Sequence, residues 1–311
     1  MNYTRRAIRL PHDNDILLDV IRQHPERHPH VIDLPYRLSS WALDEPDNGA
    51  IWLDQAGKAQ AWAVLQSPFW NIDLAVRDAP STPGIYSQVL AWAEQRALEL
   101  AGTPSGRPCW FVLALEDQVD EIQALESAGF ACQTDVPEDP WVRVQLLRPL
   151  PGSPGGAGAP AGFHIRPLGG PDEAAAYTRL HRAAFGSDNM SEEWRRRTMA
   201  RPDYCADLDL VAEADDGRLA AFCIGWYHPQ GVGGGPAAQV EPLGVHPDFQ
   251  RRGLGSALLA ELFRRAARRG ARQVYVDCDD YPDGPAFGLY HSAGFEIHRK
   301  IAIFRKDFPE G

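Results

Sequence analysis

The second half of the chain alternates apolar and polar positions, in some stretches with the period of strands and in others with that of helices. Period-two stretches predict strands at 163 to 167, 208 to 214, 219 to 226, 238 to 245, 273 to 278 and 296 to 304. Helical spacing predicts helices at 172 to 185, 191 to 200, 256 to 269 and 285 to 293. Strands that alternate with helices after an initial hairpin indicate a mixed α/β sheet flanked by helices.

The first half of the chain repeats this order of elements. Its pattern predicts strands at 50 to 54, 59 to 65, 71 to 76, 110 to 115 and 141 to 147, with helices at 85 to 100 and 119 to 128. Both halves place a Gly-Phe pair, Gly129-Phe130 or Gly294-Phe295, between a helix and the last strand. An internal duplication explains the repetition, so we expect two tandem α/β domains, each with a mixed, mostly antiparallel sheet.

A stretch rich in Pro and Gly separates the two halves. It reads PLPGSPGGAGAPAG from 149 to 162, without charge and without an apolar face of either period. Such a composition is typical of a linker. We therefore expect one domain at 1 to 148, a linker at 149 to 162 and a second domain at 163 to 311.

The composition narrows the range of partners. The 311 residues are 44% hydrophobic and 23% charged, as in globular proteins, and 31 basic minus 42 acidic residues give a net charge of −11. This charge disfavours nucleic acid and anionic membranes. The chain has no run of about 18 apolar residues and no signal-peptide core near its start. We expect a cytoplasmic protein with neither kind of partner.

Cysteine and histidine give no metal or disulfide pattern. The cysteines are odd in number and widely spaced (109, 132, 205, 223 and 278), and none forms a Cys-x-x-Cys pair, which predicts reduced thiols. Cys278 has no evident His and carboxylate partners and is interpreted as a buried strand thiol. Prolines interrupt the histidine-rich segment from 24 to 30, so we expect a solvated loop there and no metal site.

A glycine-containing turn before the helix at 256 is the main candidate for chemistry. It reads Gln250-Arg251-Arg252-Gly253-Leu254-Gly255. The glycines allow close approach of a ligand, and the first N–H groups of a helix bind phosphate-type anions. A flexible turn with a solvated arginine face is the alternative for the isolated motif. The turn lacks the Gly-Lys-Ser/Thr of a P-loop and follows several antiparallel strands, which disfavours nucleoside triphosphate and dinucleotide sites.

Residues 238 to 295 resemble the GNAT superfamily of N-acetyltransferases. The cofactor signature of that family, Arg/Gln-x-x-Gly-x-Gly/Ala, is matched in full from Gln250 to Gly255. A second signature, Asn-x-x-Ala-x-x-Leu-Tyr-x-x-x-Gly-Phe, is matched from 283 to 295 except that Asp283 replaces Asn. The resemblance is strong over 163 to 308 and rests on the plan alone before the linker. It implies two tandem GNAT-like domains and acetyl-CoA as cosubstrate.

The same resemblance implies where the cofactor binds. The candidate cofactor-binding residues are Leu243, Gly244, Val245, Gln250, Arg251, Arg252, Gly253, Leu254, Gly255, Ser256, Asp283 and Ala286. In GNAT folds the strand before the turn splays from its neighbour, and a bulge aims one N–H at the thioester carbonyl, a role that Val245 fits best. Pro242 suits such an interruption because it cannot donate a ladder hydrogen bond. Asp283 can accept but not donate as an amide does, so its contact is expected to be altered.

Two side chains are candidates for proton transfer. Acetyl transfer to an amine requires a neutral amine and a protonated leaving thiolate. Strand alternation would place Gln239, Glu241 and Leu243 on one face, so Glu241 is the candidate base and an ordinary strand carboxylate the alternative. Tyr290 stands where many members of the superfamily protonate the sulfur of coenzyme A, and a core aromatic is its alternative.

The first half lacks the corresponding features. Its turn from 77 to 85 contains two prolines, a single glycine and Asp78, which repels phosphate. When the Gly-Phe pairs are aligned, Leu125 stands opposite Tyr290. We expect this half to be a degenerate, non-catalytic GNAT-like domain, and its tryptophans could serve either a core or the wall of an acceptor pocket.

These observations lead to one functional hypothesis and two alternatives. The hypothesis is an acetyl-CoA-dependent N-acetyltransferase that acts by direct transfer on a primary amine of a small molecule, with the second domain active and the protein a monomer or homodimer. The alternatives are acetylation of protein amines and a non-catalytic acyl-CoA sensor or scaffold.

Overall fold

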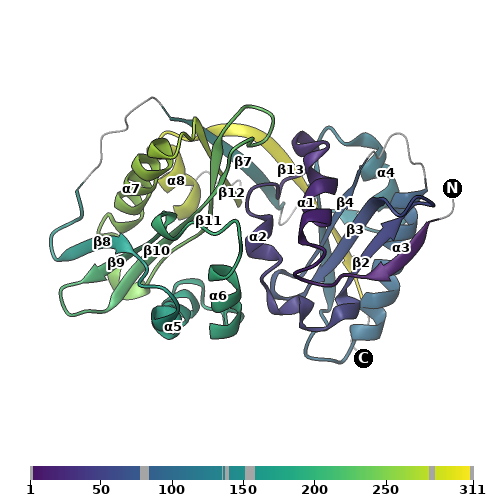
Figure 1. Cartoon of the computed structure of the whole chain (residues 1–311), viewed down its shortest axis with the longest axis horizontal. Helices are drawn as coiled ribbons and strands as arrows, with labels where there is room; N and C mark the ends of the chain where they lie inside the picture. The colour runs from purple at the N-terminus through teal and green to yellow at the C-terminus, as the bar shows by residue number, and fades with distance from the viewer. Residues whose placement is uncertain are drawn as a thin grey trace. The chain divides into compact units, whose positions relative to one another are not determined.

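The structure is a computed structural model that describes residues 3–77, 84–134, 136, 140–150, 158–279 and 284–308 (Figure 1). It divides into two compact units. Unit 1 comprises Met1–Val31, Ser40–Arg143 and Arg299–Gly311, and unit 2 comprises Ile32–Ser39 and Val144–His298. Each unit thus contains most of one half of the sequence and a segment from the other half.

Unit 2 is built on a mixed sheet with the strand order β7-β12-β11-β10-β9-β8. The pairs β8/β9, β9/β10 and β10/β11 are antiparallel, and β11/β12 is parallel. β7 comes from the first half of the sequence, where it had been expected to complete the first domain. The strands are β7 Val142–Pro149, β8 Phe163–Pro167, β9 Asp209–Ala214, β10 Leu219–His228, β11 Ala237–Val245 and β12 Gln273–Asp279.

Helices cover both faces of this sheet. Figure 1 shows α7 and α8 on one side of it and α5 and α6 on the other. The helices are α2 Leu34–Arg37, α5 Ala174–Phe185, α6 Glu192–Met199, α7 Leu254–Arg268 and α8 Pro285–Ser292, with 3₁₀ turns at Pro171–Glu173, Ala206–Leu208 and Pro247–Phe249.

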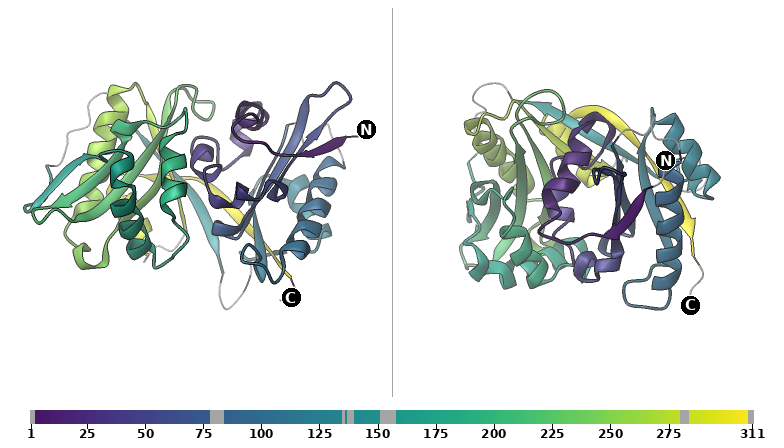
Figure 2. Two further views of the ribbon diagram at one scale, coloured as in Figure 1. Left: turned by 60° about the horizontal axis from the view of Figure 1, so that its bottom comes forward. Right: turned by 45° about the vertical axis from the view of Figure 1, so that its right-hand side comes forward.

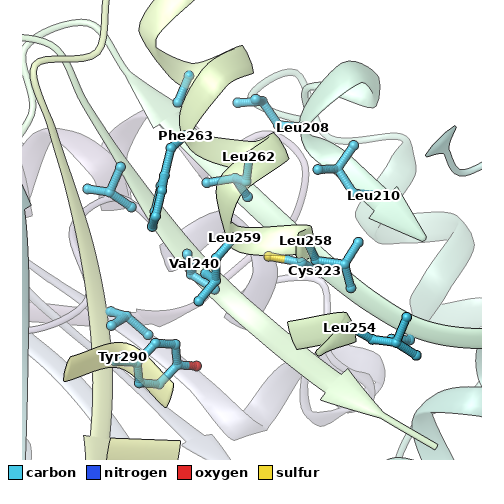
Figure 3. Close-up of a cluster of buried hydrophobic side chains, with 14 of the residues drawn as sticks. Leu208, Leu210, Cys223, Val240, Leu254, Leu258, Leu259, Leu262, Phe263 and Tyr290 are labelled. Atoms are coloured by element: carbon cyan, nitrogen blue, oxygen red, sulfur yellow. The ribbon is translucent and has the colours of Figure 1, made fainter. Parts of the chain in front are cut away.

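The apolar stripe of α7 forms the core of unit 2. Leu258, Leu259 and Leu262 are fully buried and belong to one cluster with Cys223 of β10 and Val240 of β11 (Figure 3). This is the amphipathic pattern that the sequence shows from 256 to 269, and burial of such side chains contributes about 1.5–3 kcal/mol each. On the opposite face of β10, the Phe222 ring packs 5.0 Å from Tyr177 of α5, centre to centre.

Unit 1 has the same kind of sheet, in the order β1-β2-β3-β4-β5-β13 with β6 paired to β13. Figure 2 shows β1, next to the N label, at the edge of this sheet. Its strands are β1 Thr4–Ala7, β2 Gly49–Leu53, β3 Ala59–Gln66, β4 Asn71–Val76, β5 Cys109–Leu115, β6 Ala131–Cys132 and β13 Glu296–Asp307. Its helices are α1 Asn14–Arg22, α3 Ile85–Leu100 and α4 Val119–Ser127, with 3₁₀ turns at Pro25–Arg27, Trp41–Asp44, Pro46–Asn48 and Ser67–Phe69.

The last strands of the two halves are exchanged between the units. β13 was predicted to complete the second half, but it pairs antiparallel with β5, from Ile301 opposite Leu115 to Asp307 opposite Cys109. A strand satisfies its backbone groups equally well on any sheet edge of matching register, so local sequence does not encode this partner. None of the helices formed by the described residues combines the length and the apolar character needed to cross a membrane.

The histidine-rich segment in unit 1 is more buried than predicted. His28 is 8% exposed, which contradicts the expectation of a solvated loop for the centre of this segment. Burial, reinforced by nearby cationic groups including Arg27, lowers the pKa of His28 to about 3. The imidazole is therefore neutral in the folded protein at neutral pH.

Candidate active site

β11 and β12 separate halfway along their length. Their parallel pairing runs from Ala237 opposite Gln273 to Val240 opposite Val276. β11 nevertheless continues to Val245 and β12 to Asp279. The second half of β11 therefore has no ladder partner on this side among the described pairs, and a gap opens between the two strands.

A β-bulge lies where the separation begins. On the other side of β11, Val240 is opposite Gly225 but Leu243 is opposite Cys223, so β11 carries one extra residue at Glu241-Pro242. The extra residue shifts the alternation of faces. Leu243 and Val245 consequently pack against the same apolar cluster as Val240. The prediction that Gln239, Glu241 and Leu243 share one face is wrong for Leu243.

The bulge also sets the direction of two backbone N–H groups. The N–H of His246 donates to the carbonyl of Ala220 on β10 over 2.9 Å. Because hydrogen-bonding directions alternate along an antiparallel strand, Gly244 also faces β10, whereas Leu243 and Val245 face the opposite edge. That edge is the one from which β12 has separated. These N–H groups are therefore directed into the gap, as the GNAT resemblance implies for Val245.

The turn that follows β11 presents the start of α7 without a side-chain cap. Gly253 is the N-cap residue, with φ of 78°, and no side chain caps the helix. A side chain at this φ is strained, which explains the glycine. The N–H groups of Leu254, Gly255 and Ser256 in the first turn have no intrahelical acceptor, so they are available to an anion.

The side chains of the turn are arranged around this helix end. Arg251 and Arg252 are both exposed, and the Arg252 guanidinium carbon lies 5.3 Å from the centre of the Phe249 ring. The Gln250 side-chain amide lies 3.4 Å from the carbonyl oxygen of Val245, to which it donates. A Cβ on Gly255 would lie 3.0 Å from Leu289 of α8. The second glycine thus favours close packing of α7 on Leu289.

The remaining predicted residues lie on α8 or just before it. Ala286 is exposed in the first turn of α8, and Asp283 lies outside the described residues. Tyr290, one helical turn after Ala286, is 7% exposed and belongs to the core cluster of unit 2 (Figure 3). Burial, with a contribution from Glu241, raises the pKa of Tyr290 well above its usual value. The phenol therefore stays protonated at neutral pH, as a proton donor must.

Glu241 lies within electrostatic reach of three tyrosines from different elements. Burial is the main cause of the raised pKa of Tyr36, Tyr177 and Tyr290, and the Glu241 carboxylate adds to the increase in each. Glu241 itself is half-buried. The structure thus brings the two candidate catalytic side chains, Glu241 and Tyr290, into one neighbourhood. Sequence reasoning missed Tyr36, because it lies in the first half of the chain and no motif marks it.

A buried ion pair lies beside Tyr177, one of these three tyrosines. Arg195 of α6 and Asp209 of β9 are at most 1% exposed and form a salt bridge. The guanidinium carbon of Arg195 lies 3.8 Å from the centre of the Tyr177 ring, and the Tyr204 hydroxyl donates to Asp209 over 2.5 Å. Although burial lowers it, Asp209 keeps the pKa of Arg195 above its usual value. The Arg195 guanidinium is therefore charged, and it lies against the face of the Tyr177 ring.

Comparison with known proteins agrees with this geometry. The profile of the Acetyltransferase (GNAT) family matches residues 174–295. A protein named mycothiol acetyltransferase from Clavibacter michiganensis subsp. michiganensis is 39% identical over 130 residues. That alignment covers 40% of this chain and 40% of the relative, so the similarity extends over about two fifths of each protein.

Solved structures resemble the whole chain. A GCN5-related N-acetyltransferase from Sphaerobacter thermophilus has a TM-score of 0.65 at 19% identity and covers 98% of this chain and 95% of its own. A tandem GNAT protein from the clavulanic acid biosynthesis pathway has a TM-score of 0.64 at 14% identity, over 100% of both chains. At such identities the likeness concerns the fold alone, and it confirms the predicted class of tandem GNAT-like domains. Residues 174–295, about two fifths of the chain, are thus similar to the Acetyltransferase (GNAT) family.

Proposed function

We propose that this protein is an acetyl-CoA-dependent N-acetyltransferase that acts on a primary amine of a small molecule, with its site in unit 2. The observation that carries the proposal is the gap between β11 and β12, which opens directly beside the uncapped start of α7. A pantetheine arm needs backbone partners along an extended path, and a pyrophosphate needs helix N–H groups at its end. The similarity to a mycothiol acetyltransferase supports a small-molecule acceptor.

The residues of unit 2 fit the anionic end of coenzyme A. The N–H groups of Leu254, Gly255 and Ser256 point out of the helix start, and Arg251 and Arg252 beside them are exposed. The positive end of the helix dipole and two cations at one place favour a pyrophosphate strongly over an uncharged group. Acetyl-CoA would supply the activated acetyl group as a thioester; the protein supplies positioning and proton transfer.

Three groups perform the chemistry in this proposal. Glu241 accepts a proton from the amine, directly or through water, so that the nitrogen lone pair can attack the acetyl carbon. The Val245 N–H donates to the carbonyl oxygen as negative charge develops on it. The carbon–sulfur bond then breaks, and the Tyr290 hydroxyl donates its proton to the departing sulfur. After the attack the nitrogen still carries a second excess proton, which it loses to water, and Tyr290 regains its proton from solvent. The products are an amide and the free thiol: the ammonium has lost two protons, sulfur has gained one, and one proton has passed to solvent.

Incubation with acetyl-CoA and a panel of primary amines tests the proposal. Release of free thiol should depend on the amine, and mass spectrometry should show a product heavier by one acetyl group. Peptides with free amines belong in the same panel, because turnover confined to them would replace the small-molecule acceptor by a protein. Tight acetyl-CoA binding without turnover on any amine would favour the non-catalytic sensor.

A further inference from the structure

The bulge in β11 sets the direction of the N–H groups of Leu243 and Val245, and a side chain of the neighbouring strand β10 contacts its backbone. The register passes from Val240 opposite Gly225 to Leu243 opposite Cys223, so Glu241 and Pro242 form the bulge. The indole N–H of Trp226 on β10 donates to the carbonyl of Glu241 over 2.8 Å. Trp226 is 1% exposed. This buried bond ties the backbone at the bulge to a side chain of β10.

The Trp226 indole is held in turn by a tyrosine from the first half of the sequence. Tyr36 of α2 is 2% exposed, and its ring centre lies 6.4 Å from that of Trp226. Tyr36 also stacks on Trp194 of α6, with 5.4 Å between the ring centres and an angle of 29° between the rings. Tyr204 approaches the edge of Trp226 at 6.5 Å. The indole therefore has little freedom to rotate.

Tyr36 also lies close to the candidate base. The Glu241 carboxylate contributes, after burial and Tyr177, to the raised pKa of Tyr36. The segment that carries it, Ile32–Ser39, belongs to unit 2 although it precedes most of unit 1 in the sequence. The first half of the chain thus supplies a side chain to the neighbourhood of Glu241.

From these contacts we infer that Tyr36 and Trp226 are positioning residues for acetyl transfer in unit 2. This inference rests on the proposed function. Trp226 fixes the bulge, the bulge directs the N–H groups of Leu243 and Val245 into the gap, and Tyr36 fixes Trp226. Neither side chain exchanges a proton with substrate. The segment Ile32–Ser39, from the first half of the chain, is consequently required for turnover in unit 2.

Trp226→Phe removes the indole N–H and keeps an aromatic ring. Hydrogen exchange of a peptide spanning 238 to 246 should become faster, and kcat should fall by about 10- to 100-fold, as expected for a misplaced reacting group. The dissociation constant of acetyl-CoA should rise by a smaller factor than kcat falls, because the anion site at the start of α7 is untouched. Trp62→Phe is the matched control: Trp62 is 1% exposed in unit 1, and its indole donates to the carbonyl of Leu17 over 3.1 Å.

Two variants of Tyr36 separate ring packing from the hydroxyl. Tyr36→Phe keeps the stack on Trp194 and should retain most of the turnover, whereas Tyr36→Ala should accelerate exchange at 238 to 246 and lower kcat as Trp226→Phe does. A general loss of stability would accelerate exchange throughout unit 2, so peptides from α7 serve as the internal reference.

The outcomes distinguish the inference from the proposed function. Unchanged exchange at 238 to 246 in both Trp226→Phe and Tyr36→Ala overturns the inference whether or not the protein is active. Faster exchange there with undiminished kcat also overturns it, as does an equal loss of kcat in Trp62→Phe. The wild-type protein could acetylate no amine while exchange at 238 to 246 responds to the variants as expected. Trp226 and Tyr36 would then still fix the bulge, but the proposed function, and with it their role in acetyl transfer, would be refuted.

Discussion

Two parallel strand pairs in this chain separate in a similar way, β11 and β12 in unit 2 and β4 and β5 in unit 1. β4 and β5 share the single register pair Asn71 and Phe111, whereas β11 and β12 share four. In both units a helix connects the two strands, α3 in unit 1 and α7 in unit 2. Separation of these strands is therefore a property of the duplicated fold and does not by itself make a cofactor site.

The two separations differ in what lies beside the strands. In unit 1, residues of the histidine-rich segment lie against Leu74 and Val76 of β4 and Leu113 of β5, and the cavity left among them is about 30 Å³. Arg27 forms an ion pair with Glu121, and its carbonyl accepts from the Gln118 amide over 2.9 Å. Ligand pockets usually measure about 300–1,000 Å³. The chain's own side chains thus occupy the space in unit 1.

Packing adds to the motifs in favouring unit 2 over unit 1 as the place of the proposed site. Leu125, which aligns with Tyr290, is fully buried in the apolar core of unit 1. Both positions face a core, but only Tyr290 carries a hydroxyl beside a carboxylate-bearing strand. This contrast supports assigning the proposed chemistry to unit 2.

The largest effect is expected from Tyr290→Phe, which makes unit 2 resemble unit 1 at this position. Loss of the proton donor should lower kcat by about 10²- to 10⁴-fold, the usual range for general acid catalysis. Steady-state kinetics with acetyl-CoA and the best amine of the panel measures it. Leu125→Met in unit 1 should leave kcat unchanged. Full activity of Tyr290→Phe would remove Tyr290 from the mechanism.

Arg195→Met should produce the largest loss of stability. It leaves Asp209 buried without its cation, which typically costs about 3–5 kcal/mol. The unit 1 counterpart is Arg77→Met, whose partner Asp19 is 53% exposed and stays hydrated when the cation is lost, so the loss of stability should be smaller. Urea unfolding followed by hydrogen exchange in each unit measures both. Equal losses in the two variants would show that burial of the carboxylate does not decide the cost.

Gly255→Val should weaken acetyl-CoA binding without touching the proposed catalytic groups. The new side chain meets Leu289 and Leu243, so the first turn of α7, which carries the N–H groups, should shift. Loss of bonds to a charged phosphate should cost about 2–3 kcal/mol, or roughly 30- to 150-fold in the dissociation constant. Gly288→Ala is the control, since a Cβ there meets nothing within 4 Å. The anion site would have to lie elsewhere if both variants bound equally well.

Acid should destabilise both units through buried histidines, His28 in unit 1 and His181 in unit 2. Burial lowers the pKa of each to about 3, while an unfolded histidine titrates near 6.5. Between these values the unfolded chain binds more protons, so the free energy of unfolding falls as pH decreases below about 6.5. The slope approaches about 1.4 kcal/mol per pH unit for each histidine.

His28→Asn separates the two contributions. It should reduce the pH dependence of hydrogen exchange between pH 6.5 and 5 in unit 1 and leave that of unit 2 unchanged. Identical pH dependence of the variant and the wild type in unit 1 would mean that His28 does not titrate on unfolding.

Much of the fold follows from local pattern. The period of Leu258, Leu259 and Leu262 fixes the buried face of α7, and Gly253 with Gly255 marks the start of the helix. These features depend on residues near one another in sequence, so a single chain reveals them. The role of Glu241 is inferred from strand alternation, and that of Tyr290 from the family resemblance. The cofactor turn is inferred from its glycines as well as from the resemblance, and all these roles stay predictions.

The rest depends on contacts between distant residues. The bulge at Glu241 moved Leu243 to the other face, because one inserted residue reverses a period of two. Neither the exchange of β7 and β13 nor the placement of Tyr36 in unit 2 has a local signal. The prolines beside His28 predict a solvated loop, whereas in the structure His28 lines a small cavity together with residues of β4 and β5, which are distant in sequence.

The stoichiometry of acetyl-CoA binding, measured by titration calorimetry on the full chain, tests the contrast between the two units most directly. The filled gap in unit 1 and the open helix start in unit 2 predict one site per chain, weakened strongly by Gly255→Val and unaffected by Leu125→Met. Two sites per chain, or one site that Gly255→Val leaves intact, would contradict the account.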